Sequence, residues 1–153
     1  MPGYAAMPPA PPDAPDAMGR LYDAESDLWV PGGTELASRG RRVGAYFLAI
    51  PLAIVTLFIG YIIWGLIVWG KGTTPALQVL GMRCYVIDEA RVPGFGKMAL
   101  REVVGRWLIE SIIGIIGIIS FFVFLTNKRR QPFHDMVAGT VVLYDPQKRL
   151  PVP

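Results

Sequence analysis

Residues 43–70 read VGAYFLAIPLAIVTLFIGYIIWGLIVWG, a run of 28 residues that contains no Asp, Glu, Lys or Arg. An α-helix of this length would extend about 42 Å, which exceeds the roughly 30 Å hydrocarbon core of a bilayer. Residues 107–126 form a second apolar run in which Glu110 is the only charged residue. The two runs predict a membrane protein with spans at about residues 43–69 and 107–126.

The rest of the composition fits one small domain with its charges outside those runs. The chain has 153 residues, of which 52% are hydrophobic and 18% charged. Residues 1–38 carry a net charge of −5 and the remainder +8, which together give the formal +3. Lys and Arg beside apolar runs are the usual topology signal, so the basic balance does not indicate a nucleic-acid partner. The single cysteine, Cys84, excludes an intrachain disulfide, and no cofactor or metal site is expected.

The fold class predicted from these features is an all-α membrane protein with two transmembrane helices and minor β-structure. Residues 1–35 are expected to be a disordered acidic tail, because seven of the 14 prolines lie within residues 1–31 and few apolar side chains are present. A Pro-x-x-Pro ligand motif in the same tail is the alternative. Residues 36–144 are expected to form the membrane domain and residues 145–153 a C-terminal tail. Residues 95–104 have the apolar spacing of a short amphipathic helix on the membrane surface.

Two short segments outside the apolar runs have the pattern of strands. Residues 82–87 end at a turn-prone Asp-Glu pair, and residues 141–144 are apolar and β-branched in part. The two segments could pair if they lay on one side of the membrane, but two crossings would put them on opposite sides. A re-entrant hairpin within residues 43–70, broken near Pro51 or Gly60, is the alternative that would bring them together.

Small residues recur along both apolar runs at spacings that place them on one helical face. Such residues let another helix approach closely, so they predict packing against protein, either a second copy or a larger membrane complex. The alternative is that Ala and Gly are simply common in membrane helices. The residues concerned are Ala45, Ala49, Ala53 and Gly60 in the first run and Ser111, Gly114 and Gly117 in the second.

Glu110 is an ionisable residue inside an apolar run, which makes it a candidate for an ion pathway. Arg106 precedes it by four residues, a spacing at which two helical side chains can pair. Because Glu110 lies about one turn inside the run, an interfacial ion pair with Arg106 is favoured over an ion pathway.

Three blocks flanking the apolar runs resemble the RDD family of small bacterial membrane proteins. The first is LASRGRRVGA at residues 36–45, in which Arg42 matches the family arginine. The second is GTTPALQVLGMR at residues 72–83, and the third is RQPFHDMVAGT at residues 130–140. The third block contains Arg130, Gln131, His134 and Asp135 at the family's positions. Two crossings would place Arg42 and Asp135 on the same side, so we expect an ion pair between them at the cytoplasmic interface. The alternative is that Arg42 contacts lipid phosphates and Asp135 caps the turn into residues 136–140.

The sequence departs from the family pattern at two places. Ala49 stands where the family usually has an intramembrane aspartate, and Ala76-Leu77 replaces the Gly-Lys of the middle block. The family's role is unsettled: transport has been suggested, and an antiporter activity is attributed to some members. Loss of the carboxylate at residue 49 disfavours an ion-coupled role for this chain.

Catalysis is not expected, because the chain has one His, one Cys and no Gly-rich phosphate loop. We expect a non-catalytic accessory or oligomeric packing module in the bilayer of the bacterial plasma membrane, and a component of an ion or solute transporter is the alternative. The bases beside the apolar runs predict a multi-pass protein with both termini in the cytoplasm.

Overall fold

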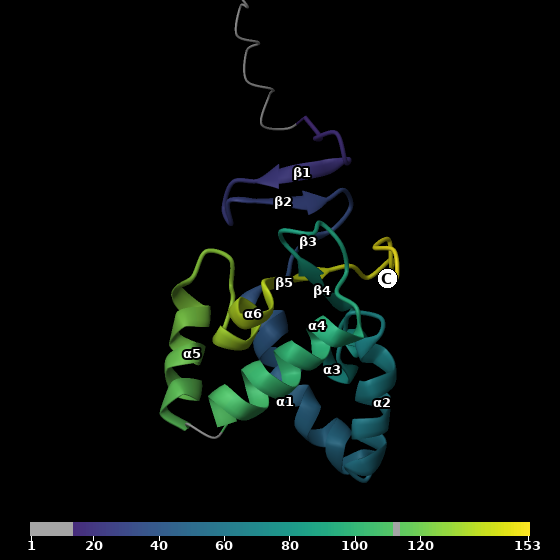
Figure 1. Cartoon of the computed structure of the whole chain (residues 1–153), viewed down its shortest axis with the longest axis vertical. Coiled ribbons are helices and arrows are strands. Elements are labelled where there is room, and N and C mark those ends of the chain that lie inside the picture. Colours follow the sequence, from purple (N-terminus) through teal and green to yellow (C-terminus); the bar gives the residue numbers. More distant parts are fainter. Residues whose placement is uncertain (1–13, 112–113) are drawn as a thin grey trace, which may run out of the picture.

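The computed structural model describes residues 14–111 and 114–153, and its strands gather at one end of the molecule while its helices form the other end (Figure 1). The elements in chain order are β1 (Arg20–Asp23), β2 (Leu28–Pro31), β3 (Glu35–Leu36), α1 (Arg39–Val55), α2 (Ile59–Trp69), α3 (Pro75–Val79), β4 (Met82–Val86), α4 (Phe95–Ala99), η1 (Leu100–Ser111), α5 (Gly114–Thr126), α6 (Phe133–Ala138) and β5 (Thr140–Tyr144).

The central sheet joins three distant parts of the chain. Its strand order is β3-β5-β4, and both pairings are antiparallel. Cys84 lies opposite Val142 in the β4-β5 pair, so the pairing considered from the sequence is confirmed. The two residues share a buried apolar cluster with Ala45 of α1 and Met98 of α4. The sheet is therefore packed against the helical half of the molecule.

This sheet requires each apolar segment to leave it and return to it. The first segment does so as a helical hairpin, in which α1 and α2 are separated by a break at Leu57 and Phe58, whose φ angles are 54° and 59°. Pro51 lies inside α1 without ending it. The arrangement of two straight crossings is therefore wrong, because it would place β4 and β5 on opposite sides.

The second apolar segment is also divided. The axes of the Phe95–Ser111 and Gly114–Thr126 helices differ in direction by 115°. No single helix within residues 14–111 and 114–153 has both the length and the apolar character needed to cross a bilayer, although this bent pair reaches them in combination.

Two further predictions from the sequence need correction. The all-α class is wrong, because the chain also forms two antiparallel sheets with five strands. The disordered tail is wrong for residues 20–31, where β1 and β2 form a hairpin in which the rings of Tyr22 and Trp29 are 5.4 Å apart. The Pro-x-x-Pro motif lies outside the described residues.

Large apolar side chains are exposed over the outer surface of the helical half. Phe47, Ile54, Leu57 and Ile59, on the first hairpin, are each more than 60% exposed. Further exposed apolar residues of the first hairpin, η1 and α5 are Ile50, Val55, Phe58, Ile62, Ile63, Leu66, Ile67, Leu100, Val103, Trp107, Leu108, Ile115, Ile118, Ile119, Phe121, Phe122 and Leu125. We call this set the apolar outer surface. Among the described residues, no exposed large apolar side chain lies on the strands β3, β4 or β5, so the apolar outer surface does not extend over the central sheet.

Candidate functional site

Asp135 of α6 is the centre of a buried charge network between the sheet and the helical half. It is fully buried, and its two carboxylate oxygens face different arginines. Arg101 of η1 donates from Nε to Oδ1 at 2.5 Å, and Arg42 of α1 places Nη2 2.6 Å from Oδ2. The Arg42–Asp135 ion pair expected from the sequence is thus present, with Arg101 as a second partner. One carboxylate connects three helices.

The short helix α6 is held in place by the residues that flank it. Pro132 provides the N-cap position, and Gly139 ends the helix with a φ of 64°, a conformation that favours glycine. Gln131 donates from Nε2 to the carbonyl of Thr140 at 2.7 Å, and Arg130 donates to the carbonyl of Leu36 at 3.1 Å. The third sequence block thus fixes the position from which Asp135 meets both arginines.

Arg101 and Glu102 belong to the network but were not singled out from the sequence as site residues. Arg101 is completely buried and donates to Glu102, while Arg106 has its Nε 3.3 Å from the other oxygen of Glu102. The helix expected over residues 95–104 is present, but its Arg101 side chain points into protein rather than lying on a membrane surface. The signal in the sequence was a pair of arginines, Arg101 and Arg106, that both lie within six residues before the start of the second apolar run at Trp107.

Glu110 pairs with His134 rather than with Arg106. Nδ1 of His134 lies 3.0 and 2.9 Å from the two oxygens of Glu110, and Ser120 of α5 donates its hydroxyl to the same carboxylate. Arg106 instead faces Glu102, four residues earlier in the π-helix of residues 100–111, and His134 of α6. The expected Arg106–Glu110 pair is therefore replaced by contacts with α5 and α6.

The hydrogen bonds of His134 define its tautomer. Arg106 places Nη2 3.1 Å from Nε2 of His134, and a guanidinium can only donate. Nε2 must therefore accept, which leaves Nδ1 as the protonated nitrogen that donates to Glu110. A neutral His134 is the form that satisfies both neighbours.

The electrostatics of α6 agree with that assignment. Burial lowers the pKa of His134 well below its usual value, and the positive charges of Arg106 and Arg101 lower it further. Burial alone would raise the pKa of Asp135, but Arg101 and Arg42 outweigh it and hold the pKa below its ordinary value. The two adjacent residues are thus a neutral imidazole and an ionised carboxylate.

The small residues of the first apolar run face protein of the same chain to different degrees. Ala45 is buried and Ala49 packs against the same cluster, which includes Ala76 and Leu77 of α3. Ala53 is half-buried, and a Cβ added to Gly60 would meet only Thr56, on its own hairpin, within 4 Å. The small residues near the start of α1 therefore pack against α3 of the same chain, and those nearer the tip of the hairpin make fewer contacts.

In the second run the small residues behave differently from one another. A Cβ added to Gly117 would lie 2.8 Å from the carbonyl oxygen of Glu110, so this glycine allows α5 to approach η1 closely. Ser111 is exposed, and a Cβ on Gly114 would meet nothing within 4 Å. Gly105, which was not singled out, permits a similarly close approach of η1 to α6, since a Cβ there would lie 2.7 Å from the Cα of His134.

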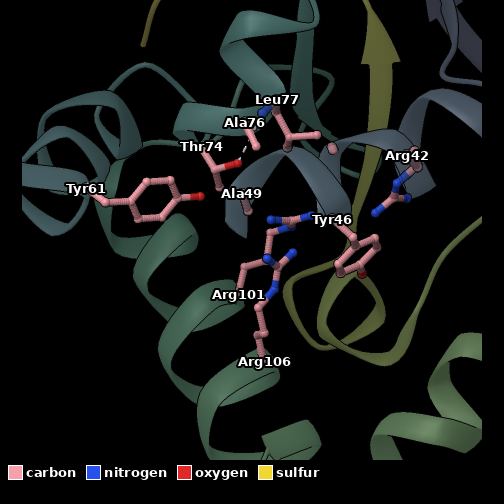
Figure 2. Close-up of a pocket in the computed structure, with 10 residues that line it drawn as sticks. Arg42, Tyr46, Ala49, Tyr61, Thr74, Ala76, Leu77, Arg101 and Arg106 are labelled. Atoms are coloured by element: carbon pink, nitrogen blue, oxygen red, sulfur yellow. Dashed lines mark hydrogen bonds between the residues drawn. The ribbon is translucent and has the colours of Figure 1, made fainter. Parts of the chain in front are cut away.

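A small cavity adjoins the network on the side of α1, α2 and α3. Its volume of about 20 Å³ is enough for one water-sized species. Figure 2 shows the guanidinium groups of Arg101 and Arg106 and the hydroxyl of Tyr61 directed toward the space that it occupies. Its lining residues are Arg42, Ala45, Tyr46, Ala49, Tyr61, Thr74, Ala76, Leu77, Arg101 and Arg106.

Within residues 14–111 and 114–153 no three His, Cys, Asp or Glu side chains gather in a group that could hold a metal ion. Burial raises the pKa of Cys84 to about 11, so its thiol is protonated at neutral pH.

The chain thus combines a small sheet, two bent pairs of apolar helices and a buried charge network. The model of the RDD family matches residues 36–139, about two thirds of the chain, so the chain belongs to the RDD family. The matched region contains the whole network, from Arg42 to Asp135. No curated protein and no solved structure matches the chain.

A double-mutant cycle should reveal the coupling between Arg42 and Asp135. We expect Asp135→Asn to cost about 3–5 kcal/mol of unfolding free energy, because it leaves two buried guanidinium groups without a counter-charge. Arg42→Gln should cost less, since Arg101 still pairs with Asp135. The loss in the double variant should be smaller than the sum by about 1–3 kcal/mol, measured by denaturation in detergent.

The exposed pair of Arg41 and Glu35, whose atoms lie 2.9 Å apart, supplies the control for this cycle. Neutralising that pair should change stability by less than about 1 kcal/mol with little coupling. Strictly additive losses for Arg42 and Asp135 would contradict the network.

Stability should fall as the pH is lowered from 7 to 5 because of His134. The unfolded chain binds a proton at His134 below about pH 6.5, whereas the folded chain resists protonation, so unfolding takes up a proton. The expected slope approaches about 1.4 kcal/mol per pH unit, and Asp135 stays ionised in this window because its pKa is lowered. His134→Asn should flatten the profile measured by thermal unfolding, and an unchanged slope in that variant would refute the assignment.

Proposed function

We propose that this RDD-family chain is a bacterial plasma-membrane protein that acts as a non-catalytic accessory or packing module. In this proposal the helical half is embedded in the bilayer from the cytoplasmic side, and the sheet stays in the aqueous phase. The observation that carries it is the apolar outer surface. Soluble monomers rarely expose a contiguous apolar patch larger than a few hundred Å², and larger patches mark membrane or protein contacts.

The backbone at the tip of the first hairpin supports embedding. Non-helical backbone is costly in lipid unless its polar groups are satisfied internally. Leu57 N donates to the carbonyl of Ile54 at 3.1 Å and Phe58 N to that of Ala53 at 2.7 Å. Gly60 N donates to the carbonyl of Thr56 at 3.0 Å. The turn thus keeps these amide groups bonded in a region whose side chains are among the most exposed apolar groups of the molecule.

The lengths of the helices favour entry and exit by the same face. With 17 residues α1 is about 25 Å long, and with 11 residues α2 is about 17 Å long, both short of the roughly 30 Å hydrocarbon core. The start of α1 and the end of α2, which lie away from the turn between them, both join segments that lead to the central sheet.

The basic residues at the ends of the apolar segments indicate the side. Arg39, Arg41 and Lys71 flank the first hairpin, and Lys128 and Arg129 follow the second apolar segment. Because the hairpins return to the sheet, all of these bases lie at the sheet end. The positive-inside rule then favours a cytoplasmic sheet and cytoplasmic termini.

The ionisable groups of the network are bonded to one another, which suits a packing role. Both nitrogens of His134 are occupied by Arg106 and Glu110, so neither is available as a general base. The apolar outer surface can contact the bilayer, a second copy of the chain or a larger membrane complex. We propose a homo-oligomer or such a complex as the working state.

Cysteine labelling in intact cells tests the embedded hairpins. In a Cys84→Ala background, single cysteines replacing the exposed Met18, Asp88 and Lys148 should all resist an impermeant maleimide and react after permeabilisation. Two straight crossings would instead expose residue 88 alone on the outer side. A cysteine replacing Leu57 should stay unreactive until the protein is denatured, because lipid would cover it.

These labelling outcomes separate the two parts of the proposal. Labelling of residue 88 without residues 18 and 148 would refute the hairpin topology. Labelling of all three in intact cells would reverse the orientation while keeping the hairpins, and rapid labelling of residue 57 in permeabilised cells would refute embedding.

A transporter component is the second candidate function. The observation in its favour is the continuous chain of polar groups from Glu110 through His134 to Arg106, which reaches the cavity. Glu110 and His134 could exchange a proton in such a chain, with Arg106, which cannot lose its proton, holding His134 in place, if the complete path were assembled from several copies.

Replacement of Glu110 by Gln should distinguish the two functions. Gln retains an oxygen that can accept from Ser120 and His134, so a packing module should keep its particle mass and a thermal midpoint within a few degrees. In proteoliposomes with a pH-sensitive dye, we expect neither wild type nor Glu110→Gln to move protons in response to a sodium gradient above the protein-free rate. Proton movement by wild type that is lost in Glu110→Gln would establish transport instead.

A further inference from the structure

We propose that the cavity between α1, α2, α3 and η1 is a binding site for a single anionic acceptor atom, either a halide ion or one phosphate oxygen of a lipid headgroup. The proposal is independent of the packing role, because it concerns a ligand held within one chain.

The wall of the cavity is positive and lacks carboxylates. Arg42, Arg101 and Arg106 line it together, whereas Asp135 and Glu102, the carboxylates that pair with them, are not among its lining residues. Three guanidinium groups thus share two carboxylates, which leaves a local excess of positive charge facing the cavity. Glu110 does not offset this excess directly, since its contacts are with His134 and Ser120.

Arg101 supplies an unused donor at this wall. It is completely buried, its Nε is taken by Asp135 and its Nη1 by Glu102. Nη2 is also buried and has no hydrogen-bond partner among the residues that the structure describes. A buried donor without a partner costs about 1–3 kcal/mol or more when charged, so an acceptor in the cavity would be strongly stabilised.

Two hydroxyl groups complete the donor set. Figure 2 shows the Tyr61 hydroxyl directed toward the arginines, and Thr74 lies beside it at the start of α3. The Thr74 oxygen accepts from the amide of Leu77 at 3.5 Å, which leaves its proton free to be donated. Arginine and hydroxyl donors facing one point are complementary to an anion, whereas a cation would meet repulsion.

The size of the cavity limits the ligand to one atom. A volume of about 20 Å³ is close to that needed for one water molecule, so a whole phosphate does not fit. One oxygen of a phosphate can enter while the rest of the group stays outside. The position near the base of the apolar outer surface is where a headgroup would lie if the hairpins are embedded.

Ala49 occupies the position from which a side chain could substitute for the ligand. It lines the cavity from α1, one helical turn beyond Ala45. An aspartate at this residue would place a carboxylate against the positive wall. Ala49→Asp therefore offers an intramolecular competitor for the proposed anion.

Thermal unfolding of the purified full chain in detergent tests the site. Chloride is titrated against gluconate at constant ionic strength, and phosphatidylglycerol against phosphatidylcholine in mixed micelles. Ligand binding to the folded state should raise the midpoint in a saturable manner by roughly 5 °C at a hundredfold excess over Kd. A response to chloride identifies the halide, and a response to phosphatidylglycerol in gluconate alone identifies the lipid phosphate.

Matched variants make the response specific to the cavity. Tyr61→Phe should weaken the ligand about tenfold, because it removes one hydrogen bond to a charged group. Tyr22→Phe on β1, whose hydroxyl bonds Asp27 instead, should leave the affinity unchanged. Ala49→Asp should abolish the response, and if this variant does not fold, the comparison of Tyr61→Phe with Tyr22→Phe still decides.

Two results would overturn the proposal. One is the lack of any midpoint shift with either chloride or phosphatidylglycerol, which would mean that the cavity holds water. The other is a shift of equal size and midpoint concentration in wild type, Tyr61→Phe and Ala49→Asp, which would show a general effect of the salt or lipid.

Discussion

Strand β5 lies between β3 and β4, and this placement constrains the rest of the chain. Each of the three strands comes from a different part of the sequence, one before the first apolar segment, one between the two segments and one after the second. The hydrogen bonds between β4 and β5, together with those between β3 and β5, therefore require both apolar segments to turn back. The break at Leu57 and Phe58 and the sharp bend after Ser111 are the local consequences of a sheet that lies on one side.

The charge network follows from the same constraint. Once both apolar segments return to the sheet, α1, η1 and α6 meet beneath it, and their polar residues face one another. Asp135 can then bind Arg42 and Arg101 at once, and His134 can connect Arg106 to Glu110. Removing these seven ionisable side chains from water is tolerable because each of them has at least one oppositely charged or hydrogen-bonding partner within the network. Gly105 makes this contact possible because it has no side chain, and any side chain there would push η1 away from α6.

The sequence alone was sufficient for the family and for several local features, but not for the topology. The third block, residues 130–140, identified the family because its residue types and spacing are specific, and its Asp135 together with Arg42 of the first block predicted the ion pair. Hydropathy located both apolar segments but could not show where they break, since Leu57 and Phe58 are ordinary apolar residues that adopt a left-handed backbone conformation. The β1-β2 hairpin was not predicted, because the proline-rich composition of residues 1–31 indicated disorder. Arg101 was missed because its helical spacing is typical of a solvated face, and only the fold of η1 against α6 turns it inward.

Position 49 shows how one small residue affects the balance of the whole network. Arginine cannot lose its proton to relieve burial, so Arg42, Arg101 and Arg106 must be neutralised by partners. Asp135 and Glu102 form the ion pairs with all three arginines, and Ala49 contributes no further negative charge. In a low dielectric a charge that lacks a partner is far more costly than one in water, because nothing replaces the lost hydration. The donors on the cavity wall are therefore the part of the network whose positive charge is not fully neutralised within the chain. An anionic ligand bound there would stabilise the folded state more than one bound elsewhere in the network.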